Sequence, residues 1–198
     1  TLVDLRVDLP KAWTQDTARG DKAGVPNAHR GYRTRHQCAL ERLATQGAAL
    51  PHRWIAGDEE MGRPSWFRRR LASLGARSLL AVPSNTTIRD LETPPPEYGR
   101  KGRPPPRPWQ SVVAWSQALE DAAWRRLDGR DGSPGPLVVE AGTRRVVSRT
   151  HRRQPGDEEF LTVIRSRDRA QDEVVQVDYY RSNTVPETSL EELARVAK

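Results

Sequence analysis

The sequence predicts an α/β fold, in which a partial mixed sheet with flanking helices is followed by a mainly antiparallel β region. Two patterns lead to this prediction. Residues 53–82 show an apolar run, a helical spacing of apolar side chains and a second apolar run, the order of a βαβ unit with parallel strands. Residues 137–180 contain short β-rich runs separated by turn-like stretches, which are typical of antiparallel strands.

The first apolar run, residues 53–57, ends in an acid, Asp58. Pro64 then stands where the first turn of a helix tolerates proline, and Gly75 ends that helix before a second strand over 78–82. In open α/β sheets, ligands bind beyond the carboxyl ends of the strands. We therefore expect Asp58 to stand at the reactive edge of the sheet.

Upstream of this unit, one strand and one helix are predicted. Residues 2–7 alternate apolar and charged side chains, the pattern of a half-buried strand. Residues 11–33 are expected to be irregular because glycine and proline interrupt them. Thr34 and Gln37 form a capping box at the start of a helix predicted over 34–46.

The second half of the chain is predicted to be strands between helices. A short helix over 111–119 and a further turn at 122–124 come first, and a capping box at Thr188 and Glu191 opens a final helix. The predicted strands are residues 137–141, 144–149, 160–165 and 174–180, with a turn at 154–157.

The charge of the chain favours a polyanionic partner. Lys and Arg total 33 against 26 acidic residues, which gives a formal charge of +7 and a pI near 10.1. Such a balance is typical of nucleic-acid-binding proteins, and a solvated arginine-rich surface is the alternative.

Other sequence patterns exclude several classes of protein. The single cysteine, Cys38, excludes an internal disulfide and a cysteine-based zinc site, and it suits a reducing cytoplasm. No apolar run approaches the ~20 residues of a membrane span, and no signal peptide is visible. The 4 histidines lack metal-ligand spacing, and neither a Gly-x-Ser-x-Gly elbow nor a P-loop is present.

Asp58 is the first candidate for chemistry. Glu59 and Glu60 add negative charge beside it, which a hard cation such as Mg²⁺ would relieve. The alternative is a helix cap or a solvated acid. Two-metal chemistry needs further carboxylates, and Asp4 and Asp8 either face the same site or remain exposed.

A basic, proline-rich segment is the second candidate. Two Pro-Pro-Pro runs favour an extended polyproline II path over residues 93–110. Such a segment either tracks a phosphate backbone, with an aromatic side chain at its end, or is a plain linker. The residues concerned are Arg100, Lys101, Arg103, Arg107 and Trp109.

Short motifs in a fixed order are similar to those of bacterial insertion-sequence transposases with a DDE endonuclease domain. The similarity is strong over residues 2–92 and weaker from 103 to 127 and from 159 to 197. The motifs are VDLRVDLPKAW at 3–13, AGVP at 23–26, TRHQCALE at 34–41, WIAGDEEMG at 54–62 and LAVPSNT at 80–86.

The resemblance implies an RNase H-like fold, a mixed sheet with helices on both faces. Three carboxylates would bind two Mg²⁺ ions, with Asp58 as the second of them and Glu59 acting indirectly behind it. One ion would activate water or a DNA 3′-hydroxyl, and the other would stabilise the leaving oxygen. The partners implied are the transposon ends and target DNA, a homodimer in the intact protein, and no membrane.

The sequence departs from the family pattern in ways that bear on activity. The first Asp of the triad is expected before Thr1 and the final Glu after Lys198, while Glu60 and Met61 replace an apolar residue and a tyrosine. We therefore expect a central fragment, or a decayed copy, that does not cleave DNA. The alternative is a non-catalytic, basic nucleic-acid-binding module.

The predicted organisation follows from the same comparison. We expect a cytoplasmic, nucleoid-associated bacterial protein. Arg100, Lys101, Arg103 and Arg107 would contact the DNA backbone of any sequence alike, with Trp109 beside them. The expected domains are a partial RNase H-like catalytic core over 1–92, a linker over 93–110, a β-rich insertion over 111–187 and the start of a further helix over 188–198.

Overall fold

The computed structural model describes residues 9–99, 102, 104–127, 137–149, 154–168, 170–184 and 187–197. These residues belong to two compact units, 1–52 and 53–198, each of which is described by itself. The strand predicted over 2–7 lies outside the described residues. Within the described ranges, no helix has the length and apolar character needed to cross a membrane.

The helix predicted over 34–46 is present in the N-terminal unit as α3 (Arg35–Gln46). Its capping box also forms as predicted. Thr34 Oγ1 accepts a hydrogen bond from the Gln37 N–H at 3.2 Å, and Gln37 Oε1 accepts one from the Thr34 N–H at 2.9 Å. Both first-turn donors are therefore satisfied without tertiary contacts.

The prediction of irregular structure over 11–33 was wrong. The Asp16 side chain caps a helix by accepting from the Arg19 N–H at 2.9 Å, and Arg30 pairs with Asp21 at 2.7 Å. Local polar contacts of this kind stabilise helices too short to show an apolar stripe. The short helices are α1 (Lys11–Gln15), α2 (Thr17–Lys22) and the 3-10 turn η1 (Asn27–His29), and a similar turn η2 (Gly47–Ala49) follows α3.

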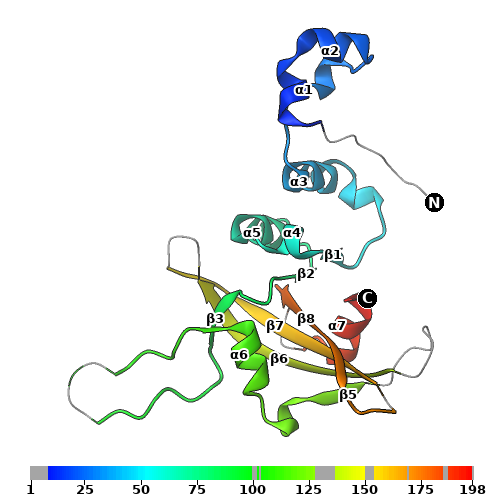
Figure 1. The fold of residues 1–198 in the computed structure, drawn as a ribbon. Coiled ribbons are helices and arrows are strands. Elements are labelled where there is room, and N and C mark those ends of the chain that lie inside the picture. Colours follow the sequence, from blue (N-terminus) through cyan, green and yellow to red (C-terminus); the bar gives the residue numbers. More distant parts are fainter. Residues whose placement is uncertain are drawn as a thin grey trace. The chain divides into compact units, whose positions relative to one another are not determined.

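A mixed sheet dominates the C-terminal unit (Figure 1). Its strands follow the spatial order β1-β2-β8-β7-β6-β3-β4. Strand β5 lies off this path and pairs with a different part of β6 from the part that pairs with β3. The strands are β1 (Ile55–Gly57), β2 (Ser78–Ala81), β3 (Thr87–Asp90), β4 (Gln110–Ser111), β5 (Arg125–Leu127), β6 (Leu137–Arg149), β7 (Pro155–Asp168) and β8 (Val174–Ser182).

The predicted βαβ unit is confirmed. Strands β1 and β2 are parallel, with Ala56 opposite Leu79, and they are joined through α4 (Glu59–Gly62) and α5 (Ser65–Ser73). A side chain at Gly62 would overlap the carbonyl oxygen of Ala81, so α4 lies directly against β2. Glycine is therefore required at position 62 by this close approach.

The long strands β6, β7 and β8 form the antiparallel part of the sheet, as predicted. The two strands predicted over 137–149 are one continuous strand, because Gly142 stays extended and makes no turn. A Cβ at Gly142 would lie 3.1 Å from the Ala123 carbonyl oxygen, so glycine serves close packing there. The turn predicted at 154–157 was also wrong, since Pro155 is the first residue of β7, a position in a strand at which proline is tolerated.

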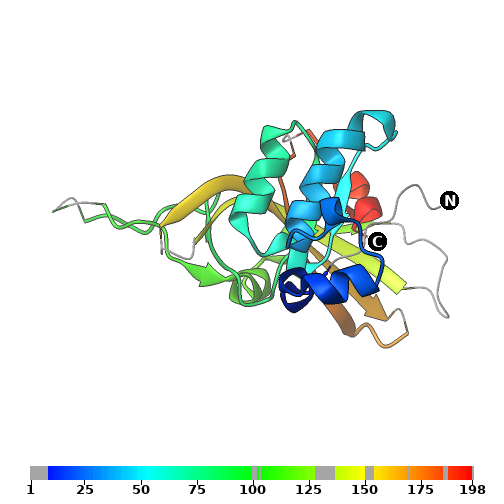
Figure 2. The same ribbon diagram turned by 90° about the horizontal axis from the view of Figure 1, so that it is seen from above.

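Helices cover both faces of the antiparallel strands. Side chains alternate between faces, so Val163 faces α6 (Val112–Gln117) and the adjacent Ile164 faces α7 (Leu190–Val196). Figure 2 shows the two helices on opposite sides of the sheet. The main core on the α6 face comprises Val82, Ile88, Val112, Trp115, Val146, Leu161, Val163 and Tyr179.

The final helix begins one residue later than the sequence predicted. Ser189, not Thr188, is the N-cap, and its side chain accepts from the Glu192 N–H at 3.1 Å. The predicted helix over 111–119 is α6, and the predicted turn after it is the 3-10 turn η3 (Asp121–Ala123).

Strands from the two halves of the chain share the sheet. Strand β2, within the predicted core 1–92, pairs with β8, within the predicted insertion 111–187, and β3 pairs with β6 in the same way. The boundaries at 92, 110 and 187 stay predictions. The described residues of 104–109 carry no helix or strand, and β4 begins at Gln110.

Candidate functional site

Asp58 stands at the carboxyl end of β1, where the sequence places it. It is exposed, and its Oδ1 accepts a hydrogen bond from the Met61 N–H at 3.0 Å. Asp58 is therefore the N-cap of α4, the alternative that the sequence left open. Glu59 and Glu60 occupy the first turn of α4, so three acidic residues follow one another at this strand end.

A pocket of about 370 Å³ opens beside Asp58. Its other walls come from β1, β2, β8 and the carboxyl end of α7. The end of the last helix thus lies at the same pocket as the end of the first strand of the sheet. The lining residues are Ala56, Gly57, Asp58, Leu79, Ala81, Tyr180, Val196 and Ala197.

Tyr180 is a pocket residue that sequence reasoning missed. Its hydroxyl donates to the Ala197 carbonyl oxygen at 3.1 Å, which holds the end of α7 against β8. Burial, and then the negative charge of Asp178, raise the pKa of Tyr180, so it remains a neutral phenol near pH 7. The alternation of faces along the predicted strand 174–180 was the available signal, because it separates Tyr180 from Tyr179.

Two further contacts hold the start of α7. The indole Nε1 of Trp54 donates to Glu192 Oε1 at 3.0 Å, just before β1 begins. Arg125 adds an ion pair with Glu191 at 2.8 Å. These contacts and the Tyr180 hydrogen bond fix the start and the end of α7, so the helix terminus is positioned at the pocket from two sides.

The described residues do not by themselves fit a two-ion metal centre. Among them, no group of three or more His, Cys, Asp or Glu side chains is placed to hold a metal ion. Asp58 fits as one oxygen ligand, since it is exposed and lines the pocket. Asp4 and Asp8 lie outside the residues that the structure describes.

The basic segment is described only in part. Arg100, Lys101 and Arg103 lie outside the described residues. Arg107 is half-buried, and its Nε donates to the Thr93 carbonyl oxygen at 2.7 Å, which ties the two ends of the segment together.

Trp109, near the end of the basic segment, contacts two arginines of the sheet. The guanidinium of Arg89 lies 4.3 Å from the centre of its ring, and that of Arg149 lies 5.4 Å away. Both distances fall within the range of cation–π contacts. The combination of an indole with two arginines was not visible in the sequence, because strand pairing brings the three residues together.

One comparison with known proteins assigns the chain to a family. The model of a family described as DDE superfamily endonuclease matches residues 1–136, which is more than half of the 198 residues. The match includes β1, Asp58 and β2. Comparisons with curated proteins and with solved structures gave no match.

Proposed function

Because the chain belongs to the DDE superfamily endonuclease family, we propose that it serves metal-dependent DNA cleavage and strand transfer in DNA transposition. The mixed sheet with helices on both faces is consistent with the RNase H-like fold of such domains. The observation that carries the proposal is the position of Asp58, at the carboxyl end of a parallel strand and in the same pocket as the end of α7.

Among the residues that the structure describes, Asp58 is the proposed metal ligand. One of its oxygens caps α4, and a carboxylate has a second oxygen for a hard cation such as Mg²⁺. When bound, Mg²⁺ supplies charge stabilisation at a scissile phosphate. Glu59 and Glu60 would raise the local attraction for the ion without binding it.

Bound manganese provides the test of this role. Mn²⁺ broadens the amide NMR signals of nearby residues, so Gly57 and Met61 should broaden in the unaltered chain and recover in Asp58→Asn. Asparagine caps a helix about as well as aspartate, so this variant removes the ligand but keeps α4. Asp16, the exposed N-cap of α2, is an internal control outside the pocket. Equal broadening around Asp16 and Asp58 would contradict a specific site.

A second function is favoured by one observation. Among the described residues, Asp58 is the acidic residue that lines the pocket. The same residues contain no group of three side chains placed to hold a metal ion. A domain of this family that binds DNA without cutting it would need no more than that. This second function requires that duplex DNA be bound but not nicked in Mg²⁺. Nicking that Asp58→Asn abolishes would instead support the catalytic role.

A further inference from the structure

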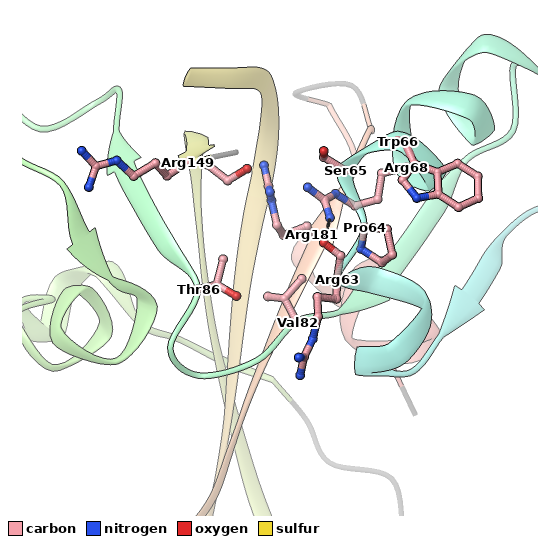
Figure 3. Close-up of a pocket in the computed structure, with 10 residues that line it drawn as sticks. Arg63, Pro64, Ser65, Trp66, Arg68, Val82, Thr86, Arg149 and Arg181 are labelled. Carbon is pink, nitrogen blue, oxygen red and sulfur yellow. Dashed lines mark hydrogen bonds between the residues drawn. The ribbon is translucent and has the colours of Figure 1, made fainter. Parts of the chain in front are cut away.

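A second pocket, of about 320 Å³, is rich in arginine (Figure 3). It lies on the α6 face of the sheet, where α5, the segment after β2 and the ends of β6 and β8 meet. Arg68 and Arg181 stand close together at its centre, and Arg63 and Arg149 extend from its sides. The lining residues are Arg63, Pro64, Ser65, Trp66, Arg68, Val82, Thr86, Ser148, Arg149 and Arg181.

The central arginines are buried. The exposed fraction is 1% for Arg181 and 6% for Arg68. Both pair with Glu159, since Arg68 Nε donates to Oε1 at 2.8 Å and Arg181 Nη2 pairs with Oε2. Arg68 Nη1 is satisfied by the carbonyl oxygens of Gly62 and Arg63. Two buried guanidinium groups therefore share one carboxylate, which leaves an excess positive charge.

Arg181 has a buried hydrogen-bond donor without an acceptor among the described residues. Its Nε is buried and has no hydrogen-bond partner in the part of the chain that the structure describes. Burial lowers the pKa of Arg181 to about 10. The negative charges of Glu159 and Asp157 oppose that shift, and the positive charge of Arg68 adds to it. A buried, charged donor without an acceptor costs free energy, and a bound anion would remove that cost.

The walls of the pocket offer neutral donors for such an anion. Ser65, Thr86 and Ser148 contribute hydroxyl groups. Ser65 is also the first residue of α5, a helix of 9 residues whose N-cap, Pro64, provides no side-chain hydrogen bond. The dipole of this helix favours negative charge at that end.

The surroundings indicate a nucleic-acid strand as the source of the anion. Arg149, on the rim, also contacts the ring of Trp109, which Arg89 contacts from closer by. An aromatic side chain beside basic groups is the usual arrangement for holding a nucleic-acid strand. We propose that the pocket binds one phosphate group of a nucleic-acid strand, an inference that rests on the proposed function.

This pocket is distinct from the one at Asp58. Leu79, Ala81 and Tyr180 line the Asp58 pocket, whereas Val82 and Arg181 line the arginine pocket. Ala81 and Val82 are consecutive at the end of β2, and Tyr180 and Arg181 are consecutive in β8, so in each pair the two side chains point to opposite faces of the sheet. The bound phosphate is therefore one that positions the strand and not the one at the Asp58 pocket.

A carboxylate placed in the pocket tests the proposal. Ser65→Glu puts a negative charge at the N-terminus of α5, where the helix dipole favours it, so the fold is preserved. Ser73→Glu adds the same charge to the exposed last residue of α5 and is the matched control. A second pair of variants removes one positive charge from the rim and leaves the interior of the pocket unchanged. Arg149→Gln is the test variant, and Arg126→Gln, at an exposed arginine elsewhere, is its control.

Anisotropy of a labelled DNA duplex gives the readout. We expect Ser65→Glu to bind about tenfold more weakly than Ser73→Glu, with a salt slope lower by about one. Equal affinity of the two variants, with the unaltered chain still binding DNA, would overturn the pocket alone. A chain that binds no duplex at low salt would overturn the proposed function together with it.

A melting experiment with inorganic phosphate distinguishes binding of a nucleic-acid strand from binding of a free anion. The unaltered chain and Ser73→Glu are melted in phosphate and in chloride of equal ionic strength. Stabilisation by phosphate that Ser65→Glu loses, combined with the predicted loss of DNA affinity, supports the proposal. The same stabilisation with unchanged DNA affinity would show that the pocket takes a free phosphate, and would overturn the nucleic-acid assignment.

Discussion

Asp58 has a structural role that is independent of any metal. Its Oδ1 receives the Met61 N–H, and the acid lies between the end of β1 and the start of α4. The sequence showed that an acid ends the strand, and it left the choice between ligand and cap open. The structure shows that the cap is real, and because a carboxylate has two oxygens the two roles are compatible.

The capping role of Asp58 leads to a prediction about stability. Asp58→Ala should lower the free energy of unfolding by about 1 kcal/mol, because the Met61 N–H loses its acceptor. Asp58→Asn should change it by a few tenths at most, since asparagine caps as well. Urea unfolding at pH 7 measures both, and equal losses in the two variants would rule out the capping role.

Asp90 connects two elements, β3 and α6. It is 4% exposed, and its Oδ2 accepts from Trp115 Nε1 at 2.9 Å. Its Oδ1 accepts from the N–H groups of Glu92 at 2.7 Å and Thr93 at 3.1 Å. Burial acts to raise the pKa of Asp90, but these donors outweigh it and hold the pKa below the ordinary 3.8.

This link predicts how stability depends on pH. A depressed pKa in the folded state means that the contribution of Asp90 is complete above the unfolded pKa. It is lost as pH falls from there through the folded value. Asp90→Asn should cost about 1–3 kcal/mol at pH 7, because an amide cannot accept from all three donors. Urea unfolding between pH 7 and pH 3 should then show a shallower acid dependence for the variant, and identical slopes would contradict the assignment.

The elements that the sequence predicted well are those with a local signal. Helix α3 has its capping box, and α5 and β2 follow Pro64 and Gly75 in the expected order. Strands β3 and β5 were not predicted, because each is short and exists through pairing with β6. Gly142 misled the prediction of β6, since glycine there permits close packing with the turn at Ala123 and makes no bend.

The candidate site was predictable in part for the same reason. Asp58 follows from one strand and one family motif. The partners that complete its pocket, Tyr180 and the end of α7, come from more than 120 positions away along the chain and depend on the pairing of β2 with β8. The arginine pocket was missed because Arg68, Glu159 and Arg181 have no common sequence pattern.

The charge of the whole molecule yields a prediction about DNA affinity. Glutamine at the cations of the basic segment should weaken duplex binding and reduce the dependence of log K on log salt by up to about 3–4, because each phosphate contact contributes about 0.9. A control with the same charge change replaces exposed arginines elsewhere. The test set is Arg100, Lys101, Arg103 and Arg107, and the control set is Arg70, Arg77, Arg126 and Arg195.

Salt titration of duplex binding by anisotropy compares the two variants. The proposal requires the test set to lose more affinity than the control set. Equal losses would mean that net charge alone, and not the basic segment, attracts DNA. An unchanged affinity in the test variant would remove the segment from the interface.

Glycine at position 62 has a consequence for the reach of Asp58. Because α4 lies against the backbone of Ala81 with no side chain between them, the position of this four-residue helix depends on glycine at residue 62. Even one methyl group there would overlap the Ala81 carbonyl oxygen, so α4 and its N-cap, Asp58, would have to shift. The position of the Asp58 carboxylate is thus determined by Gly62, a residue without a reactive side chain.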